Sequence, residues 1–203
     1  MIKIQFKDQP QLEILDAKAF EQRTGVQWLD QLVFHSYFLE SRARRRIARH
    51  HRYGMFDMQQ KWLGIYFARL VHKPLYPALV ITYINSTVGY GVRSERSLKK
   101  GEWVGEYTGI VRAREKKRDS QNFYCFEYDT GEYERAKWLI DAEKAGNYTR
   151  YINHSQTAPN LEPMQIYLEG LTHLILVAKT DIPAGTELLY DYGELYWRDR
   201  HAD

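Results

Sequence analysis

The sequence predicts an α+β protein. We expect a helical N-terminal region at residues 1–78, a mainly β domain of small sheets at residues 79–195, and a short aromatic segment at residues 196–203. Two observations support this prediction: apolar residues recur at helical intervals before residue 78, and short β-like runs separated by turn residues follow it. A hydrophobic content of 44% with 27% charged residues is typical of a folded chain and argues against extended disorder.

The first helix is expected near residue 24. Residues 24–27 (TGVQ) have the spacing of a helix capping box, and apolar residues follow at helical intervals at Trp28, Leu32 and Val33. We therefore expect a helix to begin at this point.

A second periodic stretch begins after Gly54 and is ended by Pro74 and Pro77. Its expected buried face comprises Trp62, Ile65, Tyr66, Leu70 and the residues between them. We interpret the tryptophans of the two periodic stretches, Trp28 and Trp62, as core residues rather than parts of a ligand site, because periodic aromatic residues most often pack inside a protein.

The second region contains short runs with the character of strands. These runs are residues 79–84, 103–107, 122–128, 138–141, 173–179 and 187–192. Turn residues separate them, as at 99–101 (KKG), 129–131 (DTG) and 183–185 (PAG). No linker rich in glycine and serine divides the two regions, so we expect them to pack together.

The positive charge is concentrated in residues 41–52 (SRARRRIARHHR), which contain no acidic residue. The arginines are Arg42, Arg44, Arg45, Arg46, Arg49 and Arg52, and without these six the formal net charge of +3 would be −3. Such a run can contact phosphates or an acidic protein surface, act as a nuclear address, or form the solvated face of a helix. The sequence leaves these alternatives open.

Several classes of protein are excluded or disfavoured. The single cysteine, Cys125, excludes an internal disulfide and a zinc site built from several thiolates within this chain. The longest apolar stretch, residues 75–84, is half of the roughly 20 residues that a membrane-spanning helix needs. The first residues, MIKIQFKDQPQ, lack the apolar segment of a Sec-type signal peptide, so we expect neither a membrane span nor such a signal.

Four strings in the second region combine residues that can bind or align a ligand. They are GYGV at 89–92, EYTG at 106–109, RYINHS at 150–155 with PN at 159–160, and ELLYDYG at 187–193. Taken singly, each has an ordinary structural interpretation: a turn, a glycine bend, a polar loop, and a strand with two tyrosines on one side.

In this order and spacing, the four strings resemble the GxG, EYxG, R(F/Y)xNHS…PN and ELxYDYG motifs of the SET-domain protein-lysine methyltransferases. The resemblance covers residues 84–197. The phrases INSTVGYGV, GEYTGI and DYGELYW are further similar to SET proteins of chlamydia-like intracellular bacteria. That nearer resemblance implies a bacterial effector that is made in the bacterial cytoplasm and secreted into a host cell, where it reaches the nucleus and acts on histone-like proteins.

The resemblance to the SET family implies a fold of short curved sheets in which the NHS segment and the C-terminal tyrosine strand cross in a pseudoknot. It implies S-adenosylmethionine as cofactor, S-adenosylhomocysteine as product, and a narrow channel for the substrate lysine. The implied catalytic and channel residues are Tyr192, Tyr190 and Tyr107. The implied cofactor-binding residues are Gly89, Tyr90, Gly91, Arg150, Tyr151, Asn153, His154, Tyr192 and Trp197.

The chemistry of lysine methylation agrees with an aromatic channel. A free lysine with a pKa of about 10.4 is neutral only about four times in ten thousand at pH 7, whereas methyl transfer needs the neutral amine. Burial in an apolar channel beside a positive sulfonium favours the deprotonated form by desolvation and by charge repulsion. If the Tyr190 hydroxyl faces the amine, it occupies space that a methylated nitrogen needs for a second transfer, so we expect mainly monomethylation.

The sequence also departs from the family pattern. Gln156 stands where many relatives carry cysteine, and no cysteine cluster follows the tyrosine strand, so we expect no metal. We expect the tail at residues 195–198, including Trp197, to close the site instead, although Trp197 could equally anchor the chain end.

Three functions remain open at this level: a lysine methyltransferase acting on histone-like basic proteins, a SET-like binding module without catalysis, and a nucleic-acid-binding protein that uses the arginine helix. In the first of these the arginine run could contact nucleosomal DNA, and the N-terminal helices could form a homodimer interface.

Overall fold

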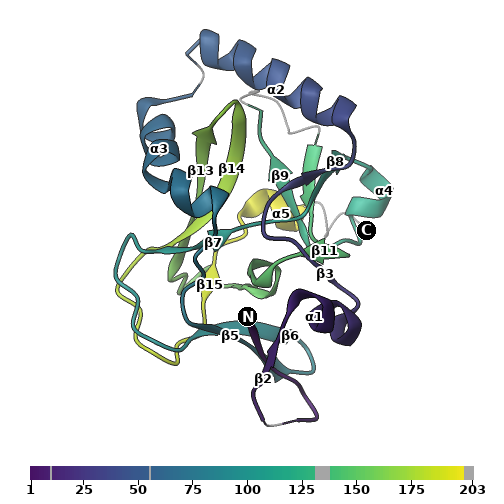
Figure 1. Ribbon diagram of the computed structural model, residues 1–203, viewed down its shortest axis with the longest axis vertical. Coiled ribbons are helices and arrows are strands. Elements are labelled where there is room, and N and C mark those ends of the chain that lie inside the picture. Colours follow the sequence, from purple (N-terminus) through teal and green to yellow (C-terminus); the bar gives the residue numbers. More distant parts are fainter. Residues whose placement is uncertain (10, 55, 131–137, 199–203) are drawn as a thin grey trace.

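The computed structural model describes residues 1–9, 11–54, 56–130 and 138–198. It consists of several small sheets with helices packed around them, so the predicted α+β architecture of small sheets is confirmed (Figure 1).

The first sheet joins the N-terminal region to the rest of the chain. Its strands, in spatial order, are β2 (Glu13–Leu15), β1 (Ile2–Gln5), β5 (Leu79–Asn85) and β6 (Gly89–Ser94). Strand β1 pairs in parallel with β5, with Ile4 opposite Ile81, and both side chains are buried in one core cluster. The two regions therefore pack together, as expected.

Two further sheets lie beside it. The strands of one sheet, in spatial order, are β4 (Val33–Phe34), β8 (Ile110–Ala113), β10 (Trp138–Asp141) and β9 (Cys125–Tyr128). The strands of the other sheet are β13 (Leu161–Leu168), β14 (Leu171–Ala178) and β7 (Trp103–Glu106). A two-residue loop joins β13 to β14, with positive φ at Glu169 (48°) and Gly170 (80°). Positive φ at both loop residues matches the right-handed twist of the flanking strands.

Two parallel pairs of two-residue strands complete the β-structure of the described residues. They are β3 (Gln27–Trp28) with β11 (Ala145–Gly146), and β12 (Asn153–His154) with β15 (Leu189–Tyr190). The second pair joins the NHS segment to the C-terminal tyrosine strand and positions the site described below.

The strand predictions are confirmed in part. Residues 79–84, 103–106, 138–141 and 173–178 lie in strands, but only 125–128 and 189–190 do so within the predicted runs 122–128 and 187–192. Residues 89–92, taken singly as a turn, belong to β6, because they pair with residues 81–85 of β5. Four short strands before residue 35 show that the N-terminal region is not wholly helical. The division of the chain at residue 78 stays a prediction.

The expected helix start at residues 24–27 is wrong. Helix α1 (Ala17–Thr24) is capped by the Asp16 side chain, which accepts a hydrogen bond from the Ala19 backbone N–H (2.7 Å), and it ends where the prediction has a helix begin. Gly25 has φ 70°, a left-handed conformation that terminates helices. The backbone then enters β3, whose partner β11 lies more than a hundred residues further along the chain.

Helices α2 (Tyr37–Arg52) and α3 (Met58–His72) lie at one end of the molecule, next to the hairpin of β13 and β14 (Figure 1). Helix α2 contains the arginine run. Three of the α3 residues predicted to be buried are instead exposed, at 66% for Trp62, 73% for Ile65 and 69% for Tyr66, whereas Phe67, also within the predicted stretch, is buried. Leu70 is partly buried.

The opposite side of α3 packs on the sheet because Gly64 allows a close approach. A Cβ at Gly64 would lie 1.9 Å from the Tyr167 carbonyl oxygen of β13. Phe67 and Val71 extend this buried side into the core. Apolar residues occur on both sides of α3, so periodicity alone could not select the buried one. The interpretation of Trp62 as a core residue is therefore wrong, whereas Trp28 is partly buried and packs against a core cluster.

Three short helical elements remain: the 3₁₀ helix η1 (Tyr148–Tyr151), α4 (Lys116–Asp119) and α5 (Glu194–Arg198). Within the described ranges, no helix is both long and apolar enough to traverse a lipid bilayer.

Candidate active site

The NHS segment and the C-terminal tyrosine strand lie side by side. Asn153 pairs with Leu189, and His154 pairs with Tyr190, in the parallel pair of β12 and β15. Asn160 extends this contact with its side chain, which donates to the Glu187 carbonyl (2.7 Å) and accepts from the Leu189 N–H (2.9 Å). The amide thus adds two hydrogen bonds to the backbone one that the Asn160 N–H donates to the Leu189 carbonyl (3.0 Å).

The GxG segment, which lies in β6, contacts the NHS segment and Glu187. The Asn153 side-chain amide donates to the Tyr90 carbonyl and to a Glu187 carboxylate oxygen, both at 3.1 Å. A Cβ at Gly91 would lie 2.7 Å from that carboxylate oxygen and 3.0 Å from the Asn153 amide nitrogen. A side chain at this position would therefore have to displace the Glu187 and Asn153 side chains that meet there. The structure thus brings Gly91, Tyr90 and Asn153 together.

His154, Tyr192 and Trp197 form one aromatic cluster. The ring centroids of His154 and Trp197 are 5.0 Å apart, and the Trp197 ring is nearly parallel to that of Tyr192, at 15°. The Tyr192 backbone N–H donates to His154 Nδ1 (3.1 Å), which places the proton of the neutral imidazole on Nε2. Nε2 has no hydrogen-bond partner in the described part of the chain, so this N–H can donate to a ligand.

A cavity of about 160 Å³ lies beside this cluster. It is lined by Tyr107, Arg114, Asp119, Phe123, Cys125, Phe126, Glu127, Leu139, Arg150, Tyr190, Tyr192 and Tyr196. The three tyrosines named from the sequence thus meet at one cavity, although Tyr107 is distant in sequence from the other two.

The hydroxyls of these tyrosines differ in their hydrogen bonds. Tyr192 donates to the Ile152 carbonyl (2.7 Å), and Tyr107 donates to the Tyr124 carbonyl (2.9 Å). Both oxygens therefore keep lone pairs that can accept a hydrogen bond. The Tyr190 hydroxyl has no hydrogen-bond partner among the residues that the structure describes.

Burial keeps two of the hydroxyls neutral. Removal from water raises the pKa of Tyr107 and of Tyr190 well above the usual value, and neighbouring tyrosines add to the effect. Glu127 and Asp119, which also line the cavity, are hydrogen-bonded to Arg114 and Arg112, respectively. Neutral tyrosine oxygens are therefore available to a substrate beside carboxylates that already have cationic partners.

Arg150 and Tyr151 are in contact, because the Arg150 guanidinium lies over the Tyr151 ring, 4.5 Å from its centroid. The Arg150 guanidinium lines the tyrosine cavity and donates to the carbonyls of Ala142 (2.7 Å) and Glu143 (3.2 Å), which indicates a structural contact. The Tyr151 ring lies 6.1 Å from that of Tyr90, on the side of the GxG segment. Cofactor contacts of Arg150, Tyr151, Gly89 and the other residues named from the sequence stay predictions.

Some lining residues were missed by sequence analysis. Tyr196 was named only as part of the closing tail, yet it lines the cavity and donates to the Phe123 carbonyl (3.1 Å). Its position next to Trp197 and four residues after Tyr192 was the available signal. No sequence signal pointed to Phe126, which packs between Tyr107 and Tyr190. Across the described ranges, no group of three or more His, Cys, Asp or Glu side chains could hold a metal ion.

Comparison with known proteins identifies the family. The family model described as "SET domain" matches residues 89–193, which is more than half of the chain. The chain belongs to the SET domain family. The match includes the GxG segment of β6, the NHS segment and both tyrosines of the C-terminal strand.

Relatives that match this chain include proteins named histone-lysine N-methyltransferases. "Histone-lysine N-methyltransferase set-1" of Caenorhabditis elegans is 36% identical over 123 residues, covering 57% of this chain and 51% of the relative. "Histone-lysine N-methyltransferase Su(var)3-9" of Drosophila melanogaster is 34% identical over 135 residues, covering 61% of this chain and 21% of the relative. A crystal structure of KRYPTONITE in complex with mCHH DNA, H3(1-15) peptide and SAH has a TM-score of 0.50 at 32% identity, covering 62% of this chain and 25% of the other.

The chain thus spans about half the length of one of these relatives and a quarter or less of the other two proteins. The similarity to proteins of chlamydia-like bacteria gains no support from these matches and stays a prediction.

Proposed function

We propose that this SET domain is a protein-lysine N-methyltransferase that uses S-adenosylmethionine. The observation that carries the proposal is the position of Tyr192. Its backbone N–H binds His154 on the side of the GxG and NHS segments, and its hydroxyl binds the Ile152 carbonyl beside the tyrosine cavity. One residue therefore borders both the face proposed for the cofactor and the channel proposed for lysine.

The residues on the first face fit S-adenosylmethionine. The His154 Nε2–H is an available donor, the rings of Trp197 and Tyr90 offer flat apolar surface, and Gly91 keeps the backbone close to Asn153. When bound, S-adenosylmethionine supplies an electrophilic methyl group on a sulfonium. Names of relatives as histone-lysine N-methyltransferases, and SAH in the KRYPTONITE complex, support this assignment.

The tyrosine cavity suits a lysine amine. The protons of the Tyr107 and Tyr192 hydroxyls are directed at backbone carbonyls, so their oxygens can accept hydrogen bonds from the amine N–H groups and orient the nitrogen lone pair. Phe126 and the tyrosine rings desolvate the amine and favour its neutral form. No strongly basic side chain is required, because this environment lowers the pKa of the lysine.

The C-terminal tail closes the site in this proposal. Tyr196 lines the lysine cavity, while Trp197, on the same short helix α5, contacts His154. Together they take the place of the zinc-bound segment of other family members. We further propose mainly monomethylation, because the Tyr190 hydroxyl is buried beside the cavity and unused by the protein.

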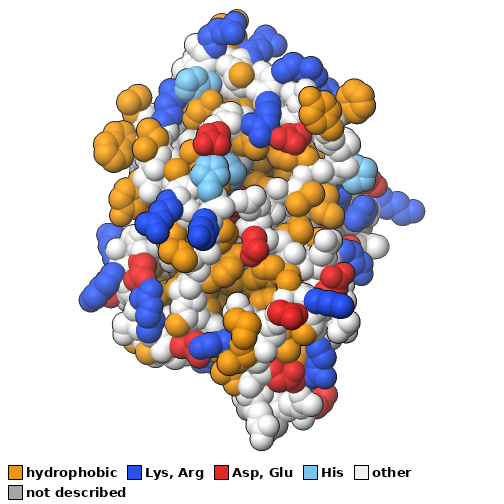
Figure 2. All heavy atoms as spheres, in the orientation of Figure 1, with side chains coloured by type: hydrophobic (Ala, Val, Ile, Leu, Met, Phe, Trp, Pro, Cys, Tyr) orange, Lys and Arg blue, Asp and Glu red, His pale blue; other side chains and the backbone are white. Residues whose placement is uncertain are grey.

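Histone-like proteins are the proposed substrates, and α2 is the proposed anchor to nucleosomal DNA. Figure 2 shows Lys and Arg side chains gathered at the end of the molecule that α2 forms. Arg42, Arg45, Arg49 and Arg52 are exposed and have no side-chain partner among the described residues. Arg44 pairs with Glu40 (2.8 Å), and the Arg46 guanidinium lies over the Trp138 ring.

The decisive experiment is incubation with a labelled methyl donor and candidate proteins, including histones, nucleosomes and the protein itself, with Tyr192→Phe as the control. Transfer to lysine by the wild-type protein, and at least a hundredfold less by the variant, supports the proposal. Absence of transfer to every substrate from neutral to alkaline pH would favour a SET-like binding module.

DNA anchoring has a separate test. Changing Arg42, Arg45, Arg49 and Arg52 to Gln should weaken nucleosome binding, and the dependence of log affinity on log salt should flatten by about 0.9 for each phosphate that is no longer neutralised. An unchanged slope would exclude α2 as the DNA-binding element. A homodimer, and delivery to a host nucleus, stay predictions that sedimentation and localisation experiments can test.

A further inference from the structure

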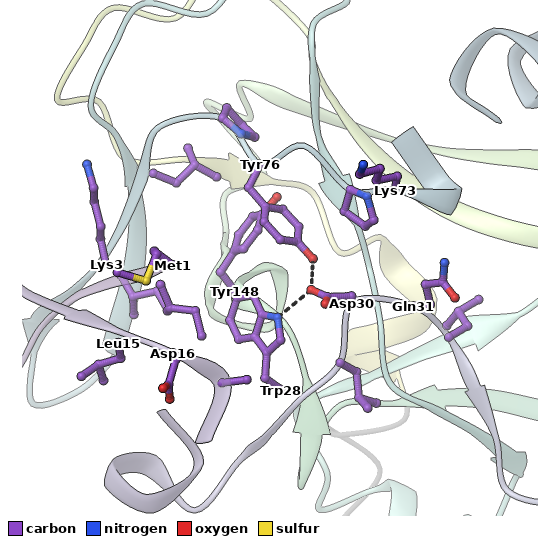
Figure 3. A pocket seen from close by; sticks show the side chains of 18 of the residues that line it. Met1, Lys3, Leu15, Asp16, Trp28, Asp30, Gln31, Lys73, Tyr76 and Tyr148 are labelled. Carbon is purple, nitrogen blue, oxygen red and sulfur yellow. Dashed lines mark hydrogen bonds between the residues drawn. The ribbon is translucent and has the colours of Figure 1, made fainter. Parts of the chain in front are cut away.

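A second cavity, of about 880 Å³, lies outside the tyrosine site (Figure 3). Its walls come from β1, the start of α1, residues 28–33 and residues 72–79, together with Tyr148. Apart from Tyr148, these residues precede the segment that matches the SET domain model. The cavity is therefore a feature of this chain's N-terminal region.

Three aromatic rings form a continuous wall on one side of this cavity. The Trp28 and Tyr76 centroids are 6.0 Å apart with perpendicular planes (88°), and those of Tyr76 and Tyr148 are 5.3 Å apart, also perpendicular (89°). Trp28 and Tyr148 lie 6.2 Å apart. Aromatic faces carry partial negative charge, so a wall of this kind attracts cations that are easily desolvated.

A carboxylate lies at the edge of the aromatic wall. Asp30 Oδ1 accepts hydrogen bonds from Trp28 Nε1 (2.8 Å) and from the Tyr76 hydroxyl, as Figure 3 shows. Asp30 Oδ2 has no partner in the described ranges, and the residue is exposed. The two donors orient the carboxylate without neutralising it, so its negative charge remains available to a ligand.

Three of the other ionisable side chains around the cavity have partners of their own. Lys3 is paired with Glu95 (2.6 Å), and the Asp16 side chain caps α1. His72 contacts Glu169 (3.2 Å). Lys73 also lines the cavity, and its amine has no side-chain partner among the described residues.

We propose that this cavity binds a methylated ammonium group, held by the Asp30 carboxylate and the wall formed by Trp28, Tyr76 and Tyr148. A methylated ammonium keeps its charge but is weakly hydrated and presents methyl groups to the rings, whereas an unmethylated ammonium loses more hydration energy on entry. Two sources share this chemistry: a methyllysine side chain of a protein, and a small quaternary ammonium compound. The site is separate from the proposed methyl transfer and does not depend on it.

Titration followed by NMR tests the proposal with three probes: a peptide containing trimethyllysine, tetramethylammonium chloride, and the same peptide with an uncharged tert-butyl isostere of trimethyllysine. We expect either charged probe, or both, to shift the Trp28 indole signal in a saturable manner. The peptide alone would identify methyllysine, and tetramethylammonium would identify a small quaternary compound. Equal affinity for the neutral isostere, or no binding of either charged probe, would overturn the proposal.

Two variants locate the site. Asp30→Asn keeps the shape of the side chain and should weaken binding about tenfold, which corresponds to about 1.4 kcal/mol, and Trp28→Leu should weaken it by a similar factor. Asp8→Asn, an exposed carboxylate outside the cavity, is the matched control and should leave affinity unchanged. Unchanged affinity in a folded Asp30→Asn protein would refute the assignment. Tyr192→Phe should bind normally, which separates this proposal from the proposed enzyme activity.

Discussion

Replacement of Tyr190 by Phe tests the proposed limit on methylation. The side chain is only 4% exposed, and its ring packs against Tyr192 (4.7 Å) and Phe126 (6.4 Å). Its hydroxyl has no described protein partner, so the variant loses no internal hydrogen bond. We therefore expect the free energy of unfolding to change by less than about 1 kcal/mol, and the substitution should alter chemistry rather than folding.

The expected size of the chemical effect follows from one hydrogen bond. If the Tyr190 hydroxyl binds the amine after the first methyl transfer, it resists the rotation that a second transfer needs. A hydrogen bond of this kind contributes about 1.4 kcal/mol, so its removal should raise the ratio of the second to the first transfer rate about tenfold. The space of the missing hydroxyl also admits the added methyl group.

Mass spectrometry of the product over time measures this ratio. The wild-type protein should yield mainly monomethyllysine, and Tyr190→Phe should yield dimethyllysine or trimethyllysine. Tyr66→Phe, which removes the same hydroxyl from an exposed position on α3, should leave the distribution as in the wild type. Dominant trimethyllysine from the wild-type protein, or an unchanged distribution in the Tyr190→Phe variant, would refute the reasoning.

Three further substitutions test the site and the fold. Tyr192→Phe should leave the protein folded and reduce turnover at least a hundredfold, because it removes one proposed acceptor for the amine; methyl incorporation and thermal unfolding measure this. Asp141→Asn should cost about 3 kcal/mol of stability at pH 7 in urea unfolding, because it breaks a buried contact with Arg112 at 2.6 Å. Gly64→Ala should destabilise by about 2 kcal/mol or more in the same measurement, because its Cβ would overlap the Tyr167 carbonyl.

The Asp141 prediction also has a dependence on pH. Burial raises the pKa of this carboxyl, but hydrogen bonds from the Glu143 N–H, Arg112 and Asn122 outweigh it and hold the pKa below its usual value. The stabilisation is therefore present above about pH 4, the usual pKa in an unfolded chain, and is lost as the pH falls through the folded value. The stability difference between wild type and Asp141→Asn should narrow in that range. A constant difference would contradict this account.

For Gly64→Ala, the matched control is Ile65→Ala, an exposed position of the same helix. It should change stability by less than about 0.5 kcal/mol. Because alanine has a higher helix propensity than glycine or isoleucine, propensity alone would stabilise both variants. A Gly64→Ala protein no less stable than the Ile65→Ala protein would therefore contradict the close contact with β13.

The sequence motifs predicted which tyrosines line the cavity. Local sequence patterns gave the wrong secondary structure where it depends on contacts between residues distant in the chain. Tyr107, Tyr190 and Tyr192 were correctly grouped, because their motifs occur together in a known family. Residues 24–27 satisfy a capping pattern, yet the pairing of β3 with β11 draws the following residues into a sheet. No local pattern reports a partner more than a hundred residues away.

The buried side of helix α3 also could not be predicted from a local sequence pattern. Apolar residues occur on both of its sides, and the choice of the buried side depends on which one lets the backbone of β13 approach. Gly64 provides that approach, and Phe67 and Val71 follow it into the core. Trp62, Ile65 and Tyr66 are left exposed. Periodicity therefore gave the wrong prediction for these three residues, because it does not report which side of the helix can approach β13 closely.

The position of Tyr192 depends on a contact that no strand pattern describes. The pair of β12 and β15 is only two residues long, too short to fix the tyrosines by backbone pairing alone. Asn160 supplies two more hydrogen bonds to residues 187 and 189 with its side chain, and the Ser155 N–H donates to the Tyr190 carbonyl (3.1 Å). Polar residues of an irregular loop thus hold the C-terminal strand in place. This explains why the NHS and PN residues, which read singly as a polar loop, are necessary to a site whose proposed chemistry is carried by tyrosines.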